Sequence, residues 1–312
     1  MTFSLLAYDP DAHQLGVASQ SHYPGVGAVV TWAEAGAGAI ATQAFADPSY
    51  GARAVALLRD GMDAGEVLAH LVADDSAPEL RQVGIVDASG TIATHTGRRC
   101  VPAVGETHRA HAVALGNTLD SDAVTTAIAD GFEHADGDLA HRLLAGLRAG
   151  EAAGGDIRGR QSAALRVVSA QPTDTPCAGV VRDLRVDDHA DPINELGRLI
   201  DLYDVFDVVS EAVFDLNGVV VGNREAHDMR TFTAAADRLT SADRALDANP
   251  EAAFWAAVVH TRAGQIDLAR QLLHSASRRN PKLPDLFGRL VDTGILTDTD
   301  VTAVTQSARA PS

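Results

Sequence analysis

The chain has one lysine, two cysteines and no long apolar run. The single lysine, Lys282, is remote in sequence from the polar segments described below, so lysine is excluded as a catalytic base. Cys100 and Cys177 are too few for a disulfide framework or a cysteine metal cluster. No segment approaches the roughly 18–20 apolar residues of a membrane helix, and the start MTFSLLAYDPD lacks the basic region of a signal peptide. We therefore expect a soluble, cytoplasmic protein.

Positive charge is also scarce. The 25 Lys and Arg residues are outnumbered by 42 Asp and Glu residues, which gives a net charge of −17. An acidic surface repels phosphate groups, so nucleic acids and anionic membranes are excluded as partners. The hydrophobic fraction of 46% suffices for a packed core and excludes a wholly disordered chain.

Apolar segments with a period of two alternate with helical segments over the first 205 residues. The order is paired strands, two helices, strands, two helices, strands and a helix, which is typical of an α+β fold and not of a doubly wound parallel sheet. We predict a four-layer αββα sandwich over residues 1–205. The predicted strands are 3–8, 15–19, 26–32, 38–42, 81–87, 91–96, 110–115, 162–168 and 180–186. The predicted helices are 50–59, 64–73, 121–133, 137–149 and 192–203.

The remainder of the chain has a different composition and periodicity. After a predicted linker at 206–230, residues 231–312 are helical and rich in alanine. The dipeptide Asn-Pro recurs at 249–250 and 280–281, and the intervening pattern resembles one tetratricopeptide unit, although about three repeats are needed for a self-sufficient solenoid. An ordinary helical hairpin explains the pattern equally well. The extension is a small all-α domain and a candidate docking element for a protein partner.

Thr2 is the sharpest chemical feature. A small residue after Met1 allows removal of the methionine, which leaves a threonine with a free α-amino group. That amine, with an ordinary pKa of about 7.7–8.0, can accept the proton of the threonine hydroxyl. Amino-terminal threonine is a known variant of the nucleophile–base pair. Because many inert proteins also begin Met-Thr, the position alone is weak evidence, and the strand predicted directly after Thr2 strengthens it.

Several segments carry a resemblance to a known family. They are MTFSLLAYDPDAHQLGVASQS, VGAVVTWAEAGAGAIATQAFADPSYG, RQVGIVDASG, THTGRRC, LGNTL, AGGDIRGRQSAAL and LRVDDHADPINELGRL. Together these segments, within residues 1–205, resemble an uncharacterised prokaryotic family of the N-terminal-nucleophile (Ntn) hydrolase superfamily. The resemblance implies the αββα fold of proteasome subunits and related amidohydrolases, with Thr2 as the nucleophile. It implies no particular substrate.

This sequence departs from proteasome-like subunits at one catalytic position. Proteasome-like subunits carry, after the first strands, an aspartate that orients a catalytic lysine. This sequence has Ser19 at that place and no lysine to orient. Either the α-amino group works with other partners, or catalysis has been lost.

The segment 154–165, GGDIRGRQSAAL, is the richest polar motif. Asp156 can orient an amine as a catalytic residue, and Arg158 can bind a substrate carboxylate through two hydrogen bonds. Gln161 and Ser162 can donate to a developing oxyanion. The plainer alternative is that Asp156 and Arg158 pair with each other and brace the turn.

Two side-chain amides follow predicted strands. Asn117 is a candidate oxyanion donor, a recurrent role in Ntn hydrolases, and the alternative is a turn residue tolerant of unusual φ. Gln43 is a further candidate for substrate binding.

Two other groups of residues are weaker candidates. Asp187, Asp188 and His189 suggest half a metal site, but adjacent strand residues point to opposite faces, so we favour a structural ion pair and predict no metal. Cys100 follows two arginines that can lower the pKa of its thiol, which makes it a rival nucleophile of low weight.

These residues lead to two hypotheses. The first is an Ntn-type amidohydrolase that cleaves a small amide, needs no cofactor, and uses Thr2, its α-amino group and an oxyanion hole that includes Asn117. A carboxylate-bearing substrate is one option. The second is a non-catalytic binding or scaffold protein with the same fold, whose helical tail recruits partners. By analogy with Ntn sandwiches, we expect a homodimer.

Overall fold

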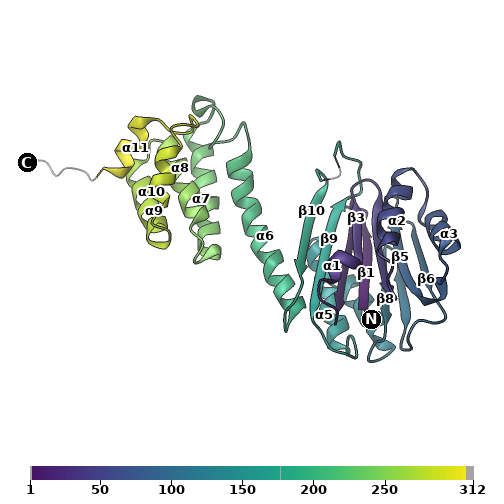
Figure 1. Ribbon diagram of the computed structural model, residues 1–312. Helices are drawn as coiled ribbons and strands as arrows, with labels where there is room; N and C mark the ends of the chain where they lie inside the picture. The colour runs from purple at the N-terminus through teal and green to yellow at the C-terminus, as the bar shows by residue number, and fades with distance from the viewer. Residues whose placement is uncertain (1, 176, 307–312) are drawn as a thin grey trace, which may run out of the picture. The chain divides into compact units, whose positions relative to one another are not determined.

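The computed structural model describes residues 2–175 and 177–306, and the chain divides into two compact units (Figure 1). Unit 1 is Met1–Ile200 and unit 2 is Asp201–Ser312. Each unit has hydrophobic core residues of its own.

Unit 1 contains two antiparallel sheets. Sheet A has the order β10-β9-β2-β1-β8-β7 and sheet B the order β3-β4-β5-β6. The strands of sheet A are β1 (Thr2–Asp9), β2 (Gln14–Ser21), β7 (Gly105–Arg109), β8 (Ala112–Asn117), β9 (Ser162–Ser169) and β10 (Val180–Val186). Those of sheet B are β3 (Thr31–Glu34), β4 (Gly38–Ala44), β5 (Arg81–Asp87) and β6 (Ile92–Thr96). The predicted mixed α+β class is confirmed.

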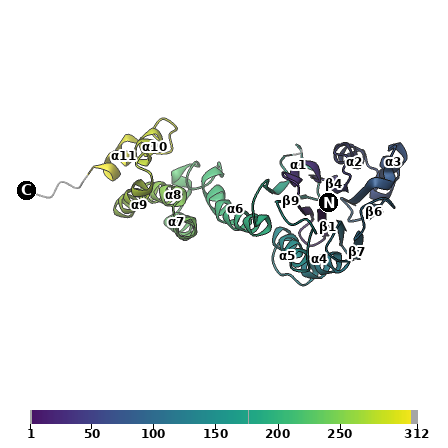
Figure 2. The same ribbon diagram turned by 60° about the horizontal axis from the view of Figure 1, so that its bottom comes forward.

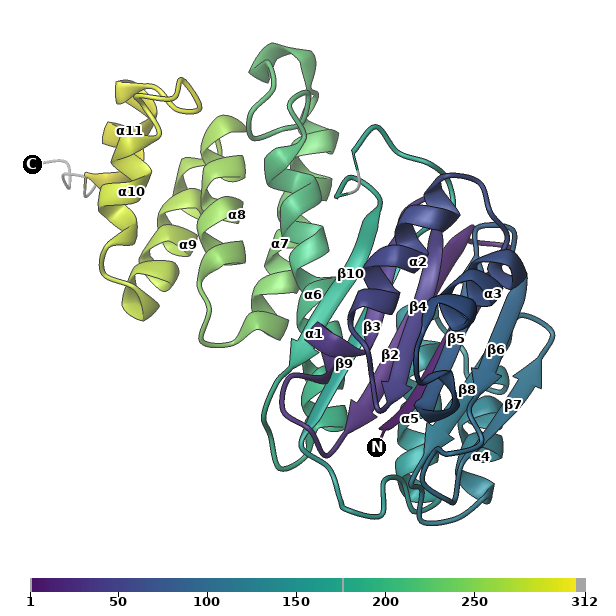
Figure 3. The same cartoon turned by 45° about the vertical axis from the view of Figure 1, so that its right-hand side comes forward.

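Helices cover the outer faces of the two sheets, and Figure 2 shows the two pairs of helices on opposite sides of the strands. The helices α4 (Ala123–Glu133) and α5 (Leu139–Ala152) pack on sheet A. The helices α2 (Ser49–Arg59) and α3 (Ala64–Asp74) pack on sheet B, in front of it in Figure 3. Separate apolar clusters fill the three spaces between these layers.

Strand β1 lies inside sheet A between β2 and β8 and is buried on both faces. Because side chains alternate along a strand, Phe3 and Leu5 pack toward the helices, whereas Leu6 packs toward sheet B. Thr2 and Ser4 share the face of Leu6. The two polar residues at the start of β1 therefore point into the space between the sheets.

Sequence periodicity missed three local features. Residues 26–29, predicted as strand, form the short helix α1 (Val26–Val29). Gly25 there has a left-handed φ of 67°, and the Ser162 hydroxyl accepts a hydrogen bond from the Val26 amide at 3.1 Å. The turn at Gly25 and this hydrogen bond outweigh the strand preference of valine. Strand β7 was not predicted, and the final helix of unit 1, α6 (Pro192–Phe214), extends eleven residues beyond its predicted end at 203.

Unit 2 is helical, as predicted for the C-terminal region. From Asp201, α6 belongs to this unit, followed by the 3-10 helix η2 (Arg224–Ala226). The predicted linker at 206–230 thus contains the end of α6. The other helices are α7 (Met229–Leu246), α8 (Glu251–Arg262), α9 (Ile266–Arg279), α10 (Leu283–Arg289) and α11 (Asp298–Thr305). Among the described residues, no helix combines the length and apolar character needed to cross a membrane.

Arg262, the last residue of α8, is a buried cation in unit 2. Its guanidinium donates to the backbone carbonyls of Val219 at 2.7 Å, Gly222 at 2.6 Å and Ile295 at 2.5 Å. Burial lowers the pKa of Arg262. This side chain joins the loop after α6 to the loop after α10.

We expect Arg262→Met to lower the free energy of unfolding of unit 2 by about 3 kcal/mol, because the substitution leaves three buried carbonyls without their donor. Urea unfolding followed by Trp255 fluorescence, in a Trp32→Phe background, measures the change within unit 2. The exposed Arg278→Met substitution in α9 is the matched control. Equal stability of the two variants would contradict the structural role of Arg262.

Candidate functional site

A cavity of about 330 Å³ opens at the start of β1. It is lined by three residues with hydroxyl groups, an amide, an arginine and small apolar side chains, namely Thr2, Ser21, Tyr23, Val26, Val29, Val30, Gln43, Ala44, Ala46, Pro48 and Arg158. Of the residues predicted for the site, Thr2, Gln43 and Arg158 therefore meet in one cavity.

Thr2 is 4% exposed, and its Oγ1 donates to the Ser21 hydroxyl at 3.1 Å. The two residues face each other in the β1–β2 register. One step deeper, the hydroxyls of Ser4 and Ser19 lie 2.7 Å apart, and Ser4 donates to Gln43 Oε1 at 2.6 Å. A ladder of polar side chains thus leads from the cavity into the space between the sheets.

Side-chain amides fix the backbone of Thr2. Its carbonyl accepts from Gln43 Nε2 at 3.4 Å and from Asn117 Nδ2 at 3.3 Å. Gln82 Oε1 accepts from the same two amides, at 2.7 Å and 3.1 Å. Asn117 is buried and is not among the residues that line the cavity. Its hydrogen bonds hold Thr2 in place.

Asp156 and Arg158 adopt the bracing arrangement that the sequence offered as an alternative. The guanidinium contacts both carboxylate oxygens, with Nε 3.1 Å from Oδ1 and Nη2 2.8 Å from Oδ2. The Asp156 side chain has no exposed surface and also accepts from the His22 amide at 3.3 Å. Arg158 still reaches the cavity wall, whereas Asp156 lies behind it.

Gln161 and Ser162 support the site without lining it. The Ser162 hydroxyl donates to the Tyr23 carbonyl at 2.5 Å, which fixes the segment leading into α1. Gln161 Nε2 donates to Asp188 Oδ1 at 3.2 Å. In the part of the chain that the structure describes, no cluster of three or more His, Cys, Asp or Glu side chains is arranged to hold a metal ion.

The rival nucleophile Cys100 is buried, and burial raises the pKa of its thiol. Its sulfur donates to the Arg81 carbonyl at 3.3 Å. The expectation that neighbouring arginines lower this pKa is wrong, because desolvation of the thiol is the largest influence.

Four residues of the site were not predicted from the sequence, namely Ser4, Ser21, Tyr23 and Gln82. A signal for the serines existed, since Thr2 and Ser4 on β1 face Ser21 and Ser19 on β2. Polar residues at every second position of otherwise apolar, buried strands need hydrogen-bond partners, so such a pattern predicts a polar cluster on one face of the sheet.

The lining of the cavity also contains a strained residue. Ala44, at the end of β4, has a φ of 70°, which is unfavourable for a residue with a Cβ atom. Such strain accumulates at functional sites, where the surrounding structure enforces it. Ala44 places the following segment, which contains Ala46 and Pro48, along the cavity.

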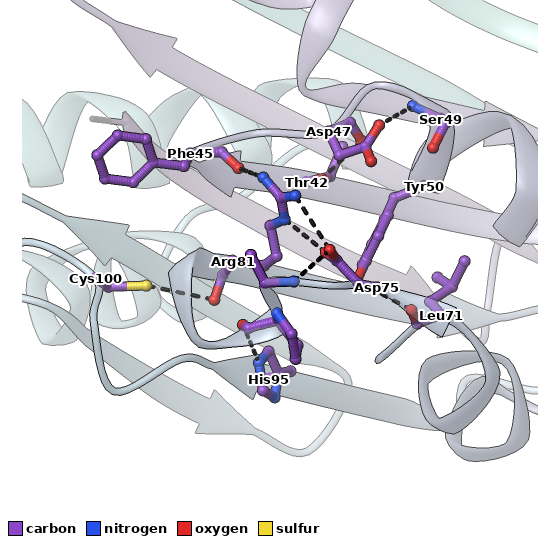
Figure 4. A network of polar contacts seen from close by, with 12 residues as sticks. Thr42, Phe45, Asp47, Ser49, Tyr50, Leu71, Asp75, Arg81, His95 and Cys100 are labelled. Atoms are coloured by element: carbon purple, nitrogen blue, oxygen red, sulfur yellow. Dashed lines mark hydrogen bonds and ion pairs between the residues drawn. The ribbon is translucent and has the colours of Figure 1, made fainter. Parts of the chain in front are cut away.

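Arg81 fastens this segment to the rest of sheet B (Figure 4). Its Nη1 donates to the Phe45 carbonyl at 2.5 Å, and its Nε donates to Asp75 at 2.7 Å. Tyr50 donates to the same carboxylate at 2.8 Å. The hydrogen bond from Arg81 holds the pKa of Asp75 well below its usual range, and burial together with Asp75 raises the pKa of Tyr50.

The fold and site define an α+β protein with two stacked antiparallel sheets and a cavity at the start of an inner strand. Residues 2–196 match the family of unknown function DUF1028, and the chain belongs to this family. The crystal structure of a DUF1028 protein from Silicibacter pomeroyi is similar, with 32% identity and a TM-score of 0.57. The similarity covers 64% of this chain and 87% of that one. A comparison with curated proteins found no match.

We expect Asp75→Asn to destabilise unit 1 by about 3 kcal/mol at pH 7, because it breaks a mostly buried ion pair. The folded-state pKa is depressed, so the stabilisation is present above the unfolded pKa of about 3.9 and disappears as the pH falls through the folded value. Urea unfolding at pH 7, 5 and 3, followed by Trp32 fluorescence in a Trp255→Phe background, should show the difference from wild type shrinking between pH 5 and 3.

The neighbouring Asp74→Asn substitution is the control, because Asp74 pairs with Arg53 on the surface and should contribute less than about 1 kcal/mol. A penalty for Asp75→Asn that does not change with pH would refute the ionic role of Asp75.

Proposed function

We propose that this protein is an Ntn-type amide hydrolase whose nucleophile is Thr2 after removal of Met1. Met1 itself lies outside the described residues. The observation that carries the proposal is the position of Thr2, whose hydroxyl reaches a cavity from the start of an inner strand of stacked sheets. The αββα order of layers and the sequence resemblance to Ntn hydrolases support the same assignment.

The proposed reaction has two stages. The Thr2 hydroxyl oxygen attacks the amide carbon, and its proton passes to the α-amino group of Thr2 and then to the departing nitrogen. This stage breaks the C–N bond, releases the amine and leaves an ester on Oγ1. Water then attacks the ester, releases the carboxylic acid and returns a proton to Oγ1. Every proton is supplied by the hydroxyl or by water, so the sequence of steps balances without a co-reactant.

The surrounding residues have positioning roles in this proposal. Gln43 and Asn117 hold the Thr2 carbonyl, and Ser21 orients the hydroxyl. A direct oxyanion role for Asn117 would require its amide to leave the Thr2 carbonyl or Gln82. We therefore assign Asn117 to the positioning of Thr2 and leave the oxyanion to backbone amides.

One observation favours the second candidate, a binding protein without catalysis. Among the described residues that line the cavity, none is a carboxylate, an imidazole or a lysine. The α-amino group of Thr2 is then the proposed base, and a chain that keeps Met1 binds ligands without cleaving them. In that case the helical unit 2, with its tetratricopeptide-like pattern, serves as an interaction module.

We expect Thr2→Ala to lower amide hydrolysis by at least about 10³-fold, whereas Thr2→Ser retains a hydroxyl nucleophile and measurable activity. All three proteins should first be shown by intact mass to lack Met1. Ser21→Ala is a graded control that removes one hydrogen bond to Thr2 and should cost about tenfold. Equal amide hydrolysis by wild type and Thr2→Ala would exclude Thr2 as the nucleophile, and a cellular protein that retains Met1 would favour the binding function.

A further inference from the structure

The walls of the Thr2 cavity are apolar beyond its floor. The hydroxyls of Thr2 and Ser21 and the amide of Gln43 lie together where β1 begins and β2 and β4 end. Most of the remaining lining is aliphatic and small, namely Val26, Val29, Val30, Ala44, Ala46 and Pro48. A group that fills this space is stabilised mainly by the burial of its own apolar surface.

Among the described lining residues, Arg158 has the one charged side chain, and Asp156 balances that charge. Both oxygens of the Asp156 carboxylate accept from it, and the Asp156 side chain has no exposed surface. A substrate carboxylate would meet a guanidinium whose charge is already balanced by a buried, bidentate partner. The pairing therefore disfavours the carboxylate-bearing substrates suggested by the sequence alone.

Three large exposed apolar side chains belong to the lining or are next to lining residues in the sequence. Tyr23 lines the cavity and is 56% exposed, Phe45 lies between the lining residues Ala44 and Ala46 and is 54% exposed, and Ile157 precedes Arg158 and is 61% exposed. We call these three residues the apolar rim. In the described part of unit 1 only one other large apolar residue is so exposed, Val101 at 39%. Exposed apolar residues on segments that line a cavity are candidates for a binding surface.

The volume of the cavity limits how much of a ligand it can hold, and a longer ligand would extend to the apolar rim. A volume of about 330 Å³ is at the lower end of the roughly 300–1,000 Å³ found for small-molecule sites, so the cavity itself admits only a short group. A longer chain must leave the cavity and would then meet the rim. In the proposed reaction the acyl group becomes attached to Thr2 in the first stage and stays there until water releases it in the second, so it is the part of the substrate that the cavity must hold.

From these observations we propose that the substrates are amides of aliphatic carboxylic acids. The acyl chain lies along Val26, Val29 and Val30, and the far end of a long chain contacts the apolar rim. This inference rests on the proposed function and specifies its substrate class. An uncharged acyl chain fits a cavity that combines the hydroxyls of Thr2 and Ser21, aliphatic side chains, and an arginine whose charge is balanced by Asp156.

The test uses the full-length protein, shown by mass to lack Met1, and a series of 4-nitroanilides with one leaving group. The acyl groups are acetyl, butanoyl, hexanoyl and octanoyl, together with 5-methylhexanoyl and glutaryl, which match in shape and differ in charge. We expect kcat/KM to rise by about fourfold for each buried methylene from acetyl to hexanoyl. The 5-methylhexanoyl anilide should react at least tenfold faster than the glutaryl anilide.

The rim is tested with Phe45→Ser and Ile157→Ser, which alter exposed side chains, and with Val101→Ser as the matched control. Each rim variant should lower kcat/KM for the octanoyl substrate by fivefold or more and leave the acetyl substrate unchanged, whereas Val101→Ser should change neither. Faster cleavage of the glutaryl anilide, or cleavage independent of chain length, would overturn the substrate class and leave the hydrolase assignment intact.

Two further measurements keep the outcomes distinct. If no anilide is cleaved, the proposed function fails, and calorimetric titration with octanoate and glutarate decides whether the aliphatic preference survives as a binding property. Failure to bind octanoate overturns the substrate class as well. If the rim variants dissociate a dimer in sedimentation experiments without altering the chain-length profile, the rim is a contact between copies of this chain, and the proposal is wrong.

Discussion

The site depends on one buried side chain, the amide of Gln82. Gln82 lies on β5 of sheet B, yet its Nε2 donates to the carbonyls of Gly105 and Gly116 in sheet A. Its oxygen accepts from Gln43 of sheet B and Asn117 of sheet A. A buried amide without partners is costly, so these bonds restrict how the two sheets can slide past each other. The position of Thr2 is a consequence of that restriction.

Periodicity in the sequence was sufficient for most strands and helices of unit 1, because strands such as β5 and β10 are marked by their own apolar patterns. It failed at α1, where Val26–Val29 have the composition of a strand and the Val26 amide donates a hydrogen bond to the side chain of the distant Ser162. The local sequence does not reveal a hydrogen-bond partner that lies far away along the chain. The same reason explains why the link from Gln82 to Asn117 was not predicted.

The polar motif at 154–165 shows a second limit. Residue types alone suggested catalytic and substrate-binding roles, but the roles depend on which partner each charge finds. Asp156 and Arg158 form an ion pair with each other, and the Ser162 hydroxyl donates to the backbone just before α1. Thr2, in contrast, was identified from chemistry peculiar to the chain start, and the structure brings it to a cavity together with Gln43 and Arg158. The family match ends at residue 196, so unit 2 lies outside the shared part of the fold, and the Thr2 cavity lies within it.

The scarcity of lysine has a chemical consequence for Thr2. Lys282 is exposed at the start of α10 in unit 2 and is the only lysine of the chain. An ordinary lysine amine has a pKa of about 10.4, far above the value of about 7.7–8.0 for an α-amino group. At neutral pH an acylating reagent therefore distinguishes the two amines of a chain that begins at Thr2. A single covalent label, located by peptide mapping, would mark the Thr2 cavity in one unit and leave the other unit unmodified.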